Sequence, residues 1–394
     1  MRICRFYNAI SRKPEGFGVG LYELSLAQKR LKNDIFIISK TISSKKIQNF
    51  KHKRISFNLI PYIPKFGVIN AFIPFGILSF FRLNQLIKHN MVDLLHTHDI
   101  DAFYLIKKNP KIPIISTFHV DKQAQMQRIS EITSFPGSRI FESTKFKANY
   151  TIWKKSKAII CISKQTQNRL TRIYKIPASK IYYIPNGVNT EKFNPNVQSL
   201  NLKSSLNIEH NYPTILFVGQ IYPLKGLTEL IEALSTLRKT YPKLKLLITG
   251  AVRDWRYFKE IKNIIHKKNM NKNIKFIGKV PYSLMPRIYR SIDIFVLPSY
   301  SEGLPKVLLE AMASRLCVIA TAVEGNKDII RNNETGILIQ PKNVPILYQN
   351  LLKVTDDTKF REKLALNAWK SVQRYNWDNI AKQIQEVYKK ALNV

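Results

Sequence analysis

The sequence predicts an α/β protein built from two doubly wound, Rossmann-like domains. Two observations support this prediction. Short β-branched and apolar runs alternate with helical stretches along the chain, which favours parallel sheets with helices on both faces. The alternation stops in a polar segment without strands and then starts again, and 394 residues are enough for two domains that each bury a core.

The first domain is expected to open with a strand over residues 2–9, a glycine-rich turn over 16–20, a helix over 21–31 and a strand over 35–39. Leucines that recur on or near one face indicate the helix. Later strands are predicted at residues 94–96, 114–117, 158–162 and 182–184. This order predicts a parallel sheet for the first domain.

The polar segment over residues 196–213 is the predicted linker, so residues 1–195 form the first domain and residues 214–375 the second. The same strand and helix order returns after the linker. Strands are predicted at 214–218, 245–249, 274–277, 292–297 and 318–320, with helices at 227–240, 257–268 and 282–290. Because ligands bind beyond the carboxyl ends of the strands in such sheets, we expect functional residues there.

Glu302 and Glu310 are separated by seven residues and are the most informative pair in the chain. Glu302 follows a buried-strand pattern and lies on a turn with Gly303 and Pro305, whereas Glu310 lies in an apolar run that predicts a helix. Free N–H groups and the dipole at such a helix start can bind a phosphate, and the carboxylates can bind sugar and ribose hydroxyls. The pattern predicts a nucleotide-sugar site.

Lys225 follows the strand predicted at 214–218 and precedes Gly226 and a helix. A lysine in this position can lie against a diphosphate and stabilise the negative charge of a leaving nucleotide. The alternative interpretation is a solvated loop lysine in a lysine-rich chain. Gly219 and Gly226, which flank the lysine, favour the diphosphate interpretation.

These residues belong to an ordered series of motifs that resembles the retaining glycosyltransferases of family 4, which have the GT-B fold. The series comprises residues 16–24, 92–99, 115–119, 158–163, 184–195, 217–226, 246–250, 274–278 and 299–313, and spans roughly residues 16 to 340. The last segment is similar to the family's Glu-x7-Glu signature. The resemblance implies two domains that face a central cleft, with the acceptor on the first and the donor on the second. It also implies that the helix over residues 376–394 packs back on the first domain.

The resemblance assigns roles to individual residues. Lys225 would stabilise the diphosphate, Glu302 would bind hydroxyls of the donor sugar, and Glu310 would bind the ribose. His119, at the end of a predicted strand, would contact the donor sugar near the reacting carbon. Gly18 would let its loop approach the diphosphate, since glycine has no Cβ.

Backbone groups around the second motif would complete the donor site. The resemblance places peptide groups of residues 303–308 near the sugar and phosphates, among them those of Gly303, Leu304, Val307 and Leu308. At Gln220 the family usually has arginine, so a full charge is lost in the donor site; Arg253 and Lys306 are candidates to replace it. Arg315 stands where the family usually has glycine, at an expected cost of about 1 kcal/mol.

No metal site is predicted. Cys4, Cys161 and Cys317 are widely spaced in apolar runs, and a reduced compartment is the simplest interpretation. His96 and His98 flank Thr97, on opposite sides of a strand end, and are expected to pack or form hydrogen bonds. The expected reaction uses no cofactor other than the substrate, a UDP- or GDP-linked sugar.

The net charge of +38 comes from 64 lysines and arginines against 26 acidic residues, and it is larger in the first half of the chain. Such a field draws a protein toward polyanions. A lysine-rich genome is an equally good explanation of the composition. Nucleic acid is not expected as a partner, because no recognition motif accompanies the charge. Residues 66–81 are apolar but too short and interrupted by Pro74 to span a membrane.

The sequence therefore predicts metal-independent, retaining transfer of a sugar to a lipid, glycan or small-molecule acceptor. The protein is expected in the cytoplasm, because no signal peptide is visible. Its positive charge adds the expectation of peripheral contact with an anionic membrane. Two alternatives stay open: a GT-B sugar-nucleotide epimerase, and a weakly active subunit that binds a nucleotide sugar.

Overall fold

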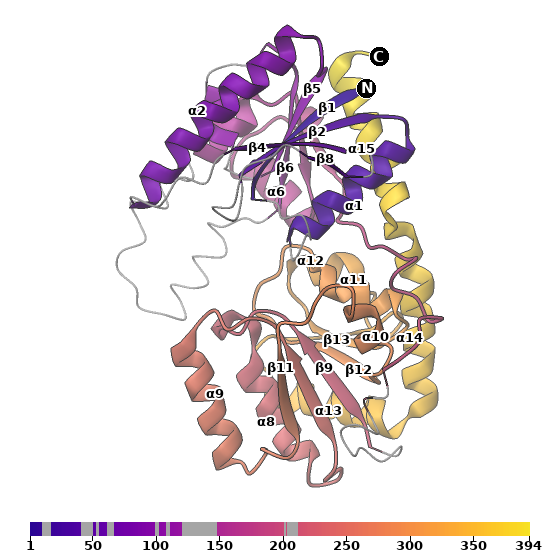
Figure 1. Cartoon of the computed structure of the whole chain (residues 1–394). Helices are drawn as coiled ribbons and strands as arrows, with labels where there is room; N and C mark the ends of the chain where they lie inside the picture. The colour runs from indigo at the N-terminus through magenta and orange to yellow at the C-terminus, as the bar shows by residue number, and fades with distance from the viewer. Residues whose placement is uncertain are drawn as a thin grey trace. The chain divides into compact units, whose positions relative to one another are not determined.

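The computed structural model describes residues 1–9, 17–40, 50–52, 55–60, 67–98, 102–107, 111–119, 148–200, 202 and 212–394. The chain forms two compact units (Figure 1). Unit 1 contains Met1–Gly187 and Trp377–Val394, and unit 2 contains Val188–Asn376. Gly16 and most of the predicted linker lie outside the described residues.

Unit 1 is built on an eight-stranded sheet in the order β3-β4-β2-β1-β5-β6-β7-β8. Every pair of neighbours is parallel except β3 and β4. The strands are β1 (Arg2–Ala9), β2 (Asp34–Lys40), β3 (Phe50–His52), β4 (Ile55–Ile60), β5 (Leu94–His98), β6 (Ile114–Phe118), β7 (Ala158–Cys161) and β8 (Ile181–Tyr183). β3 and β4 were not predicted from the sequence.

Helices cover both faces of this sheet (Figure 1). On one face, helices α1 (Phe17–Arg30) and α15 (Trp377–Leu392) pack against each other. They contribute Leu24 and Ile384, among other residues, to the core on this face. On the other it contains Leu83 of α2 (Gly67–Lys88), Ile106 of α3 (Phe103–Lys107) and Leu170 of α6 (Lys164–Arg172). A 3-10 helix, η3 (Ala178–Lys180), precedes β8. The sheet is therefore doubly wound.

The predicted glycine-rich turn over residues 16–20 is wrong from Phe17 onward. Helix α1 begins at Phe17, so Gly18 and Gly20 are helical. Glycine disfavours a helix, but Gly18, Val19 and Gly20 are buried. Tertiary packing thus outweighs local propensity here. Helix α2 continues through Pro74.

Unit 2 contains a six-stranded sheet in the order β11-β10-β9-β12-β13-β14, with all neighbours parallel. The strands are β9 (Thr214–Val218), β10 (Lys245–Thr249), β11 (Ile274–Gly278), β12 (Ile294–Leu297), β13 (Cys317–Thr321) and β14 (Ile337–Ile339). Ile215 and Phe217 of β9 face one core cluster, and Leu216 between them is buried on the opposite face. The order of the strands reverses between β9 and β12, which is where open α/β sheets bind ligands.

The helices of unit 2 connect these strands. They are η4 (Pro223–Lys225), α8 (Leu227–Leu237), α9 (Trp255–Lys267), α10 (Met285–Tyr289), α11 (Lys306–Ala313), α12 (Glu324–Ile329), α13 (Val344–Asp356), α14 (Thr358–Val372) and η5 (Gln373–Tyr375). The prediction of two doubly wound α/β domains is confirmed, because both sheets are largely parallel and flanked by helices.

The segment before the predicted linker belongs to unit 2. Val188 donates a backbone hydrogen bond to the carbonyl of Tyr375 over 2.9 Å. Phe193 is fully buried and its ring lies 5.5 Å from that of Tyr282 and 5.8 Å from that of Tyr289. These contacts, which the apolar pattern did not reveal, place the change of unit at Gly187 rather than at residue 195.

Helix α11 ends at Ala313 with Ser314 as its C-cap, and the next residue, Arg315, is in the left-handed conformation with φ of 59°. Arg315 and Leu316 donate to the carbonyls of Met312 and Ala311 over 3.0 and 3.1 Å, the pattern of a Schellman cap. This is the position at which the sequence predicted a cost for a non-glycine residue.

We expect Arg315→Gly to raise the free energy of unfolding by about 0.5–1 kcal/mol, because the left-handed penalty exceeds the extra entropy of unfolded glycine. Urea denaturation measures the change. Arg315→Ala is the control, since it removes the same charge and keeps the Cβ. An equal gain in Arg315→Ala would show that charge repulsion, and not the backbone, destabilises this cap.

Candidate active site

The loops at the carboxyl ends of β9 and β12 are in close backbone contact. Gly226 has φ of +64°, and a Cβ there would lie 2.1 Å from the carbonyl oxygen of Pro298. The N–H of Tyr300 donates to the carbonyl of Leu224 over 2.8 Å. Only glycine permits this approach, which places η4 against the loop between β12 and α11.

This contact brings Lys225 and Glu302 together. Lys225 Nζ lies 2.5 Å from Glu302 Oε1, and the two side chains are only 16% and 11% exposed. Burial opposes the charge of Lys225, but attraction to Glu302 and Tyr222 outweighs it and raises the pKa of the lysine. Lys225 therefore stays protonated at neutral pH, and two residues singled out in the sequence form one charged site.

Helix α11 begins beside this pair, as its apolar pattern predicted. Pro305 is its N-cap residue, and no side chain caps the helix. Gly303 is half-buried, and Leu304 is buried. The N–H of Leu308 donates to the carbonyl of Pro305 over 3.2 Å, and its side chain is buried.

Glu310 lies in a different environment from Glu302. It is 7% exposed, and Tyr289 donates its hydroxyl to Glu310 Oε2 over 3.2 Å and also reaches the carbonyl of Val307. Burial raises the pKa of Glu310 to about 7, although Lys306, Tyr289 and Tyr282 act in the opposite direction. The sequence identified Glu310 but not the two tyrosines, because aromatic residues in a helical stretch resemble core residues.

Gln220 follows β9 and has an exposed side chain. Gln220 is neutral and adds no positive charge at this edge of the sheet. Lys225, at the same edge, is already paired with Glu302. Two further side chains of unit 2 lie near the lysine: Arg253, which the sequence offered as a candidate to replace the missing charge, and Tyr222, which it did not single out. The ring of Tyr222 lies 6.0 Å from Lys225 Nζ and 4.6 Å from the guanidinium carbon of Arg253.

Unit 1 places three histidines together at the carboxyl ends of β5 and β6. His98 Nδ1 lies 2.9 Å from His119 Nε2, and the two rings stack. His96 bonds the hydroxyls of Tyr388 and Thr117 over 2.6 and 2.7 Å. The expectation that His96 and His98 are on opposite sides of the strand is wrong: their ring centroids are 4.5 Å apart. Residues i and i+2 of a strand share a face.

These imidazoles are buried, and burial is the main reason why the pKa values of His96 and His98 are well below 6.5. Both are therefore neutral at pH 7 and act as hydrogen-bonding groups. His119 lies directly after β6, as predicted, and Gly18 lies in the first turn of α1. The assignments of both residues to the donor stay predictions.

Within the described residues, no group of three His, Cys, Asp or Glu side chains is arranged to hold a metal ion. Over the same part of the chain, no helix combines the length and apolar character needed to cross a bilayer.

Comparison with known proteins is consistent with this geometry. The model of Glycosyltransferase Family 4 matches residues 14–192, and that of Glycosyl transferases group 1 matches residues 199–371. An uncharacterized glycosyltransferase of Methanocaldococcus jannaschii is 28% identical, covering 77% of this chain and 76% of that protein. An Escherichia coli UDP-Gal:alpha-D-GlcNAc-diphosphoundecaprenol alpha-1,3-galactosyltransferase is 26% identical, covering 78% and 77%.

Solved structures show the same fold. Sucrose-phosphate synthase of Thermosynechococcus elongatus superimposes with a TM-score of 0.84 at 20% identity, covering 99% of both chains. HepE of Anabaena, in complex with UDP and glucose, has a TM-score of 0.76 at 18% identity, again covering 99% of both. The fold and site define a GT-B enzyme. The chain belongs to the family 4 glycosyltransferases and is a transferase.

The raised pKa of Glu310 predicts how stability depends on pH. The folded state binds more protons than the unfolded state between pH 4.5 and about 7. Stability should therefore fall as pH rises through this window, by about 3 kcal/mol at most. In Glu310→Gln this fall in stability with rising pH should be absent, because glutamine does not titrate.

The measurement is the urea midpoint at pH 5 and pH 7.5 for wild type and Glu310→Gln. The buried histidines titrate in both proteins and cancel in the comparison. Glu362→Gln, at an exposed position of α14, is the control and should behave like wild type. The same dependence of stability on pH in wild type and Glu310→Gln would contradict a raised pKa of Glu310.

Proposed function

We propose that this enzyme transfers a sugar from a UDP- or GDP-sugar to a hydroxyl acceptor, with retention at the anomeric carbon and without a metal ion. The observation that carries the proposal is the buried pair of Lys225 and Glu302 at the carboxyl ends of β9 and β12. This pair offers a cation for a diphosphate and a carboxylate for sugar hydroxyls. Glu310, among tyrosines, offers a carboxylate for the ribose.

In the proposed reaction the bond between the anomeric carbon and the diphosphate oxygen breaks, and the acceptor oxygen forms the new bond on the same face. The acceptor proton moves to the departing diphosphate, so charges and atoms balance. Lys225 stabilises the negative charge that develops on the diphosphate. Glu302 holds the sugar hydroxyls and orients the reacting carbon. No protein nucleophile is assigned, and His119 is proposed to contact the sugar through a hydrogen bond.

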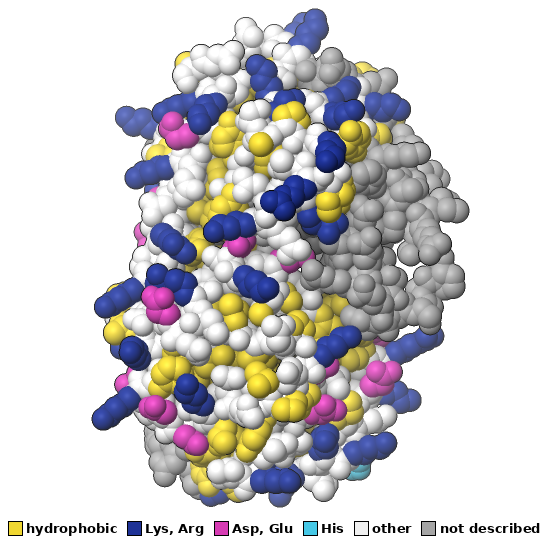
Figure 2. Space-filling view, turned by 180° about the vertical axis from the view of Figure 1, so that it is seen from behind, with side chains coloured by type: hydrophobic (Ala, Val, Ile, Leu, Met, Phe, Trp, Pro, Cys, Tyr) yellow, Lys and Arg dark blue, Asp and Glu magenta, His cyan; other side chains and the backbone are white. Residues whose placement is uncertain are grey.

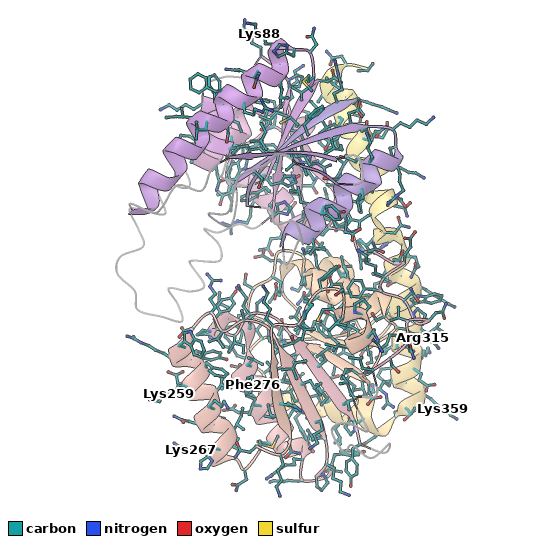
Figure 3. The ribbon with its side chains drawn as sticks, viewed as in Figure 1. Lys88, Lys259, Lys267, Phe276, Arg315 and Lys359 are labelled. Carbon is teal, nitrogen blue, oxygen red and sulfur yellow. The ribbon has the colours of Figure 1, made fainter. Side chains whose placement is uncertain are left out.

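The acceptor in this proposal is a lipid or glycan held at an anionic membrane surface. Helix α2 packs Leu83 and Leu86 into the core but leaves Leu78 40% and Phe81 66% exposed. Lys88, at the C-terminal end of the same helix, points away from the protein (Figure 3). Lysines and arginines also outnumber acidic side chains over the face shown in Figure 2. The E. coli relative, a UDP-Gal:alpha-D-GlcNAc-diphosphoundecaprenol alpha-1,3-galactosyltransferase, supports this choice.

The same proposal places the protein in the cytoplasm, peripherally on the inner face of the membrane. Cys4, Cys161 and Cys317 are all buried thiols, which suits a reducing compartment.

A second candidate function is a weakly active subunit that binds a nucleotide sugar, and the neutral, exposed Gln220 favours it. A large gain in turnover in Gln220→Arg would support an impaired enzyme.

The donor is tested by incubating the protein with a panel of UDP-, GDP- and ADP-sugars and measuring nucleotide release without acceptor. We expect slow hydrolysis of one UDP- or GDP-sugar, and a loss of about 100-fold in kcat for Lys225→Gln. Lys239→Gln, an exposed lysine beyond α8, is the matched control. Equal rates in wild type and Lys225→Gln would remove the proposed role of the lysine.

Membrane contact is tested by co-sedimentation with vesicles of phosphatidylglycerol and of phosphatidylcholine. We expect preferential binding to the anionic vesicles, weakening as salt rises, because exposed charges are screened. Leu78→Ser with Phe81→Ser should reduce this binding several-fold, whereas Ile173→Ser, at another exposed apolar position of unit 1, should not. Equal binding to both vesicles would contradict membrane contact.

A further inference from the structure

The charge of the proposed donor site is incomplete with Lys225 alone. A nucleoside diphosphate group brings at least two negative charges, whereas the lysine and Glu302 form a pair whose net charge is zero. Gln220 adds no charge at the end of β9. Binding in a largely buried place requires further positive charge, because uncompensated charges are costly away from water.

A second cation is fixed beside the lysine by the loop that follows β10. This loop is joined to the loop after β9 by backbone hydrogen bonds: Ile221 donates to Ala251 over 2.9 Å, and Arg253 donates to Ile221 over 3.1 Å. Gly250 makes the contact feasible, because a Cβ there would lie 1.9 Å from the carbonyl oxygen of Gly219. Arg253 is therefore held at the same sheet edge as Gln220.

The side chain of Arg253 lies over the ring of Tyr222 and is close enough to Lys225 to act on its charge. Its guanidinium carbon lies 4.6 Å from the centre of the Tyr222 ring, and Lys225 Nζ lies 6.0 Å from the same ring centre. The ring is attractive to both cations and holds the arginine close to the lysine despite their repulsion. In the described part of the chain Arg253 forms no ion pair, and it is exposed, so its N–H groups can bind a ligand.

Other cations near this edge are less suitable. Lys306 lies close to Glu310 on the same helix, and burial lowers the pKa of this lysine to about 8 although Glu310 acts in the opposite direction. Lys259 and Lys267 lie further along α9 and point outward (Figure 3). Asp254, next to Arg253, accepts hydrogen bonds from the N–H groups of Arg256 and Tyr257 and so caps α9.

We propose that Arg253, positioned by Tyr222, binds the diphosphate of the donor together with Lys225 and supplies the charge that Gln220 lacks. The inference rests on the proposed function, because it concerns the same donor site. It assigns Arg253 to binding and charge stabilisation and leaves the roles of Glu302 and Glu310 unchanged. Arginine suits this role, since its planar group can bind two phosphate oxygens at once.

The experiment is calorimetric titration of the full chain with UDP and GDP, and with UMP and GMP. We expect Arg253→Gln to weaken binding of the diphosphate that wild type prefers by about tenfold, and of the matching monophosphate by less than about threefold. Arg256→Gln removes an equal, exposed charge three residues away and should change neither. Adding Gln220→Arg to Arg253→Gln should recover most of the diphosphate affinity.

The outcomes separate this inference from the proposed function. If wild type binds neither UDP nor GDP, both fail. If Lys225→Gln loses diphosphate binding while Arg253→Gln binds like wild type, the assignment of Arg253 alone is overturned. Equal losses in Arg253→Gln and Arg256→Gln would indicate a general effect of net charge and would also overturn it. Circular dichroism of each variant verifies that the fold is kept.

Discussion

The ion pair of Lys225 and Glu302 depends on two loops whose backbones touch at the carboxyl ends of neighbouring strands. Gly226 permits that contact, because any side chain would collide with the carbonyl of Pro298. Two charges can remain largely buried there since each compensates the other over 2.5 Å. The contact between the two loops thus fixes the positions of both groups relative to each other.

Under the proposed function, this pairing would let a charged donor enter at small cost. A diphosphate would give Lys225 an anionic partner, and a sugar hydroxyl would give Glu302 a hydrogen-bond donor. Neither group is left uncompensated when the direct contact loosens. A diphosphate still carries more charge than one lysine balances, and the arginine beside Tyr222 is placed to supply the remainder. The acidic and basic groups of unit 2 therefore act as one electrostatic system.

The polar cluster of unit 1 has the opposite character. His96 and His98 are buried and neutral at pH 7, and they are held by Tyr388, Thr117 and His119. Neutral imidazoles form directional hydrogen bonds and add no charge that would compete for a phosphate. Tyr388 comes from the last helix of the chain, so α15 both covers the sheet and orients the ring of His96.

The sequence by itself determined the two α/β domains and the main candidate residues. Strand and helix periods are local properties, and Lys225, Glu302 and Glu310 lie at recognisable junctions between elements. Tertiary structure decided what those residues touch. The start of α1 at Phe17, the place of Phe193 in unit 2 and the shared face of the histidines depend on packing or on the geometry of neighbouring elements. Arg253 and Lys225 both lie near the ring of Tyr222 because hydrogen bonds join two loops about 30 residues apart in the sequence. A local sequence pattern cannot predict such a contact.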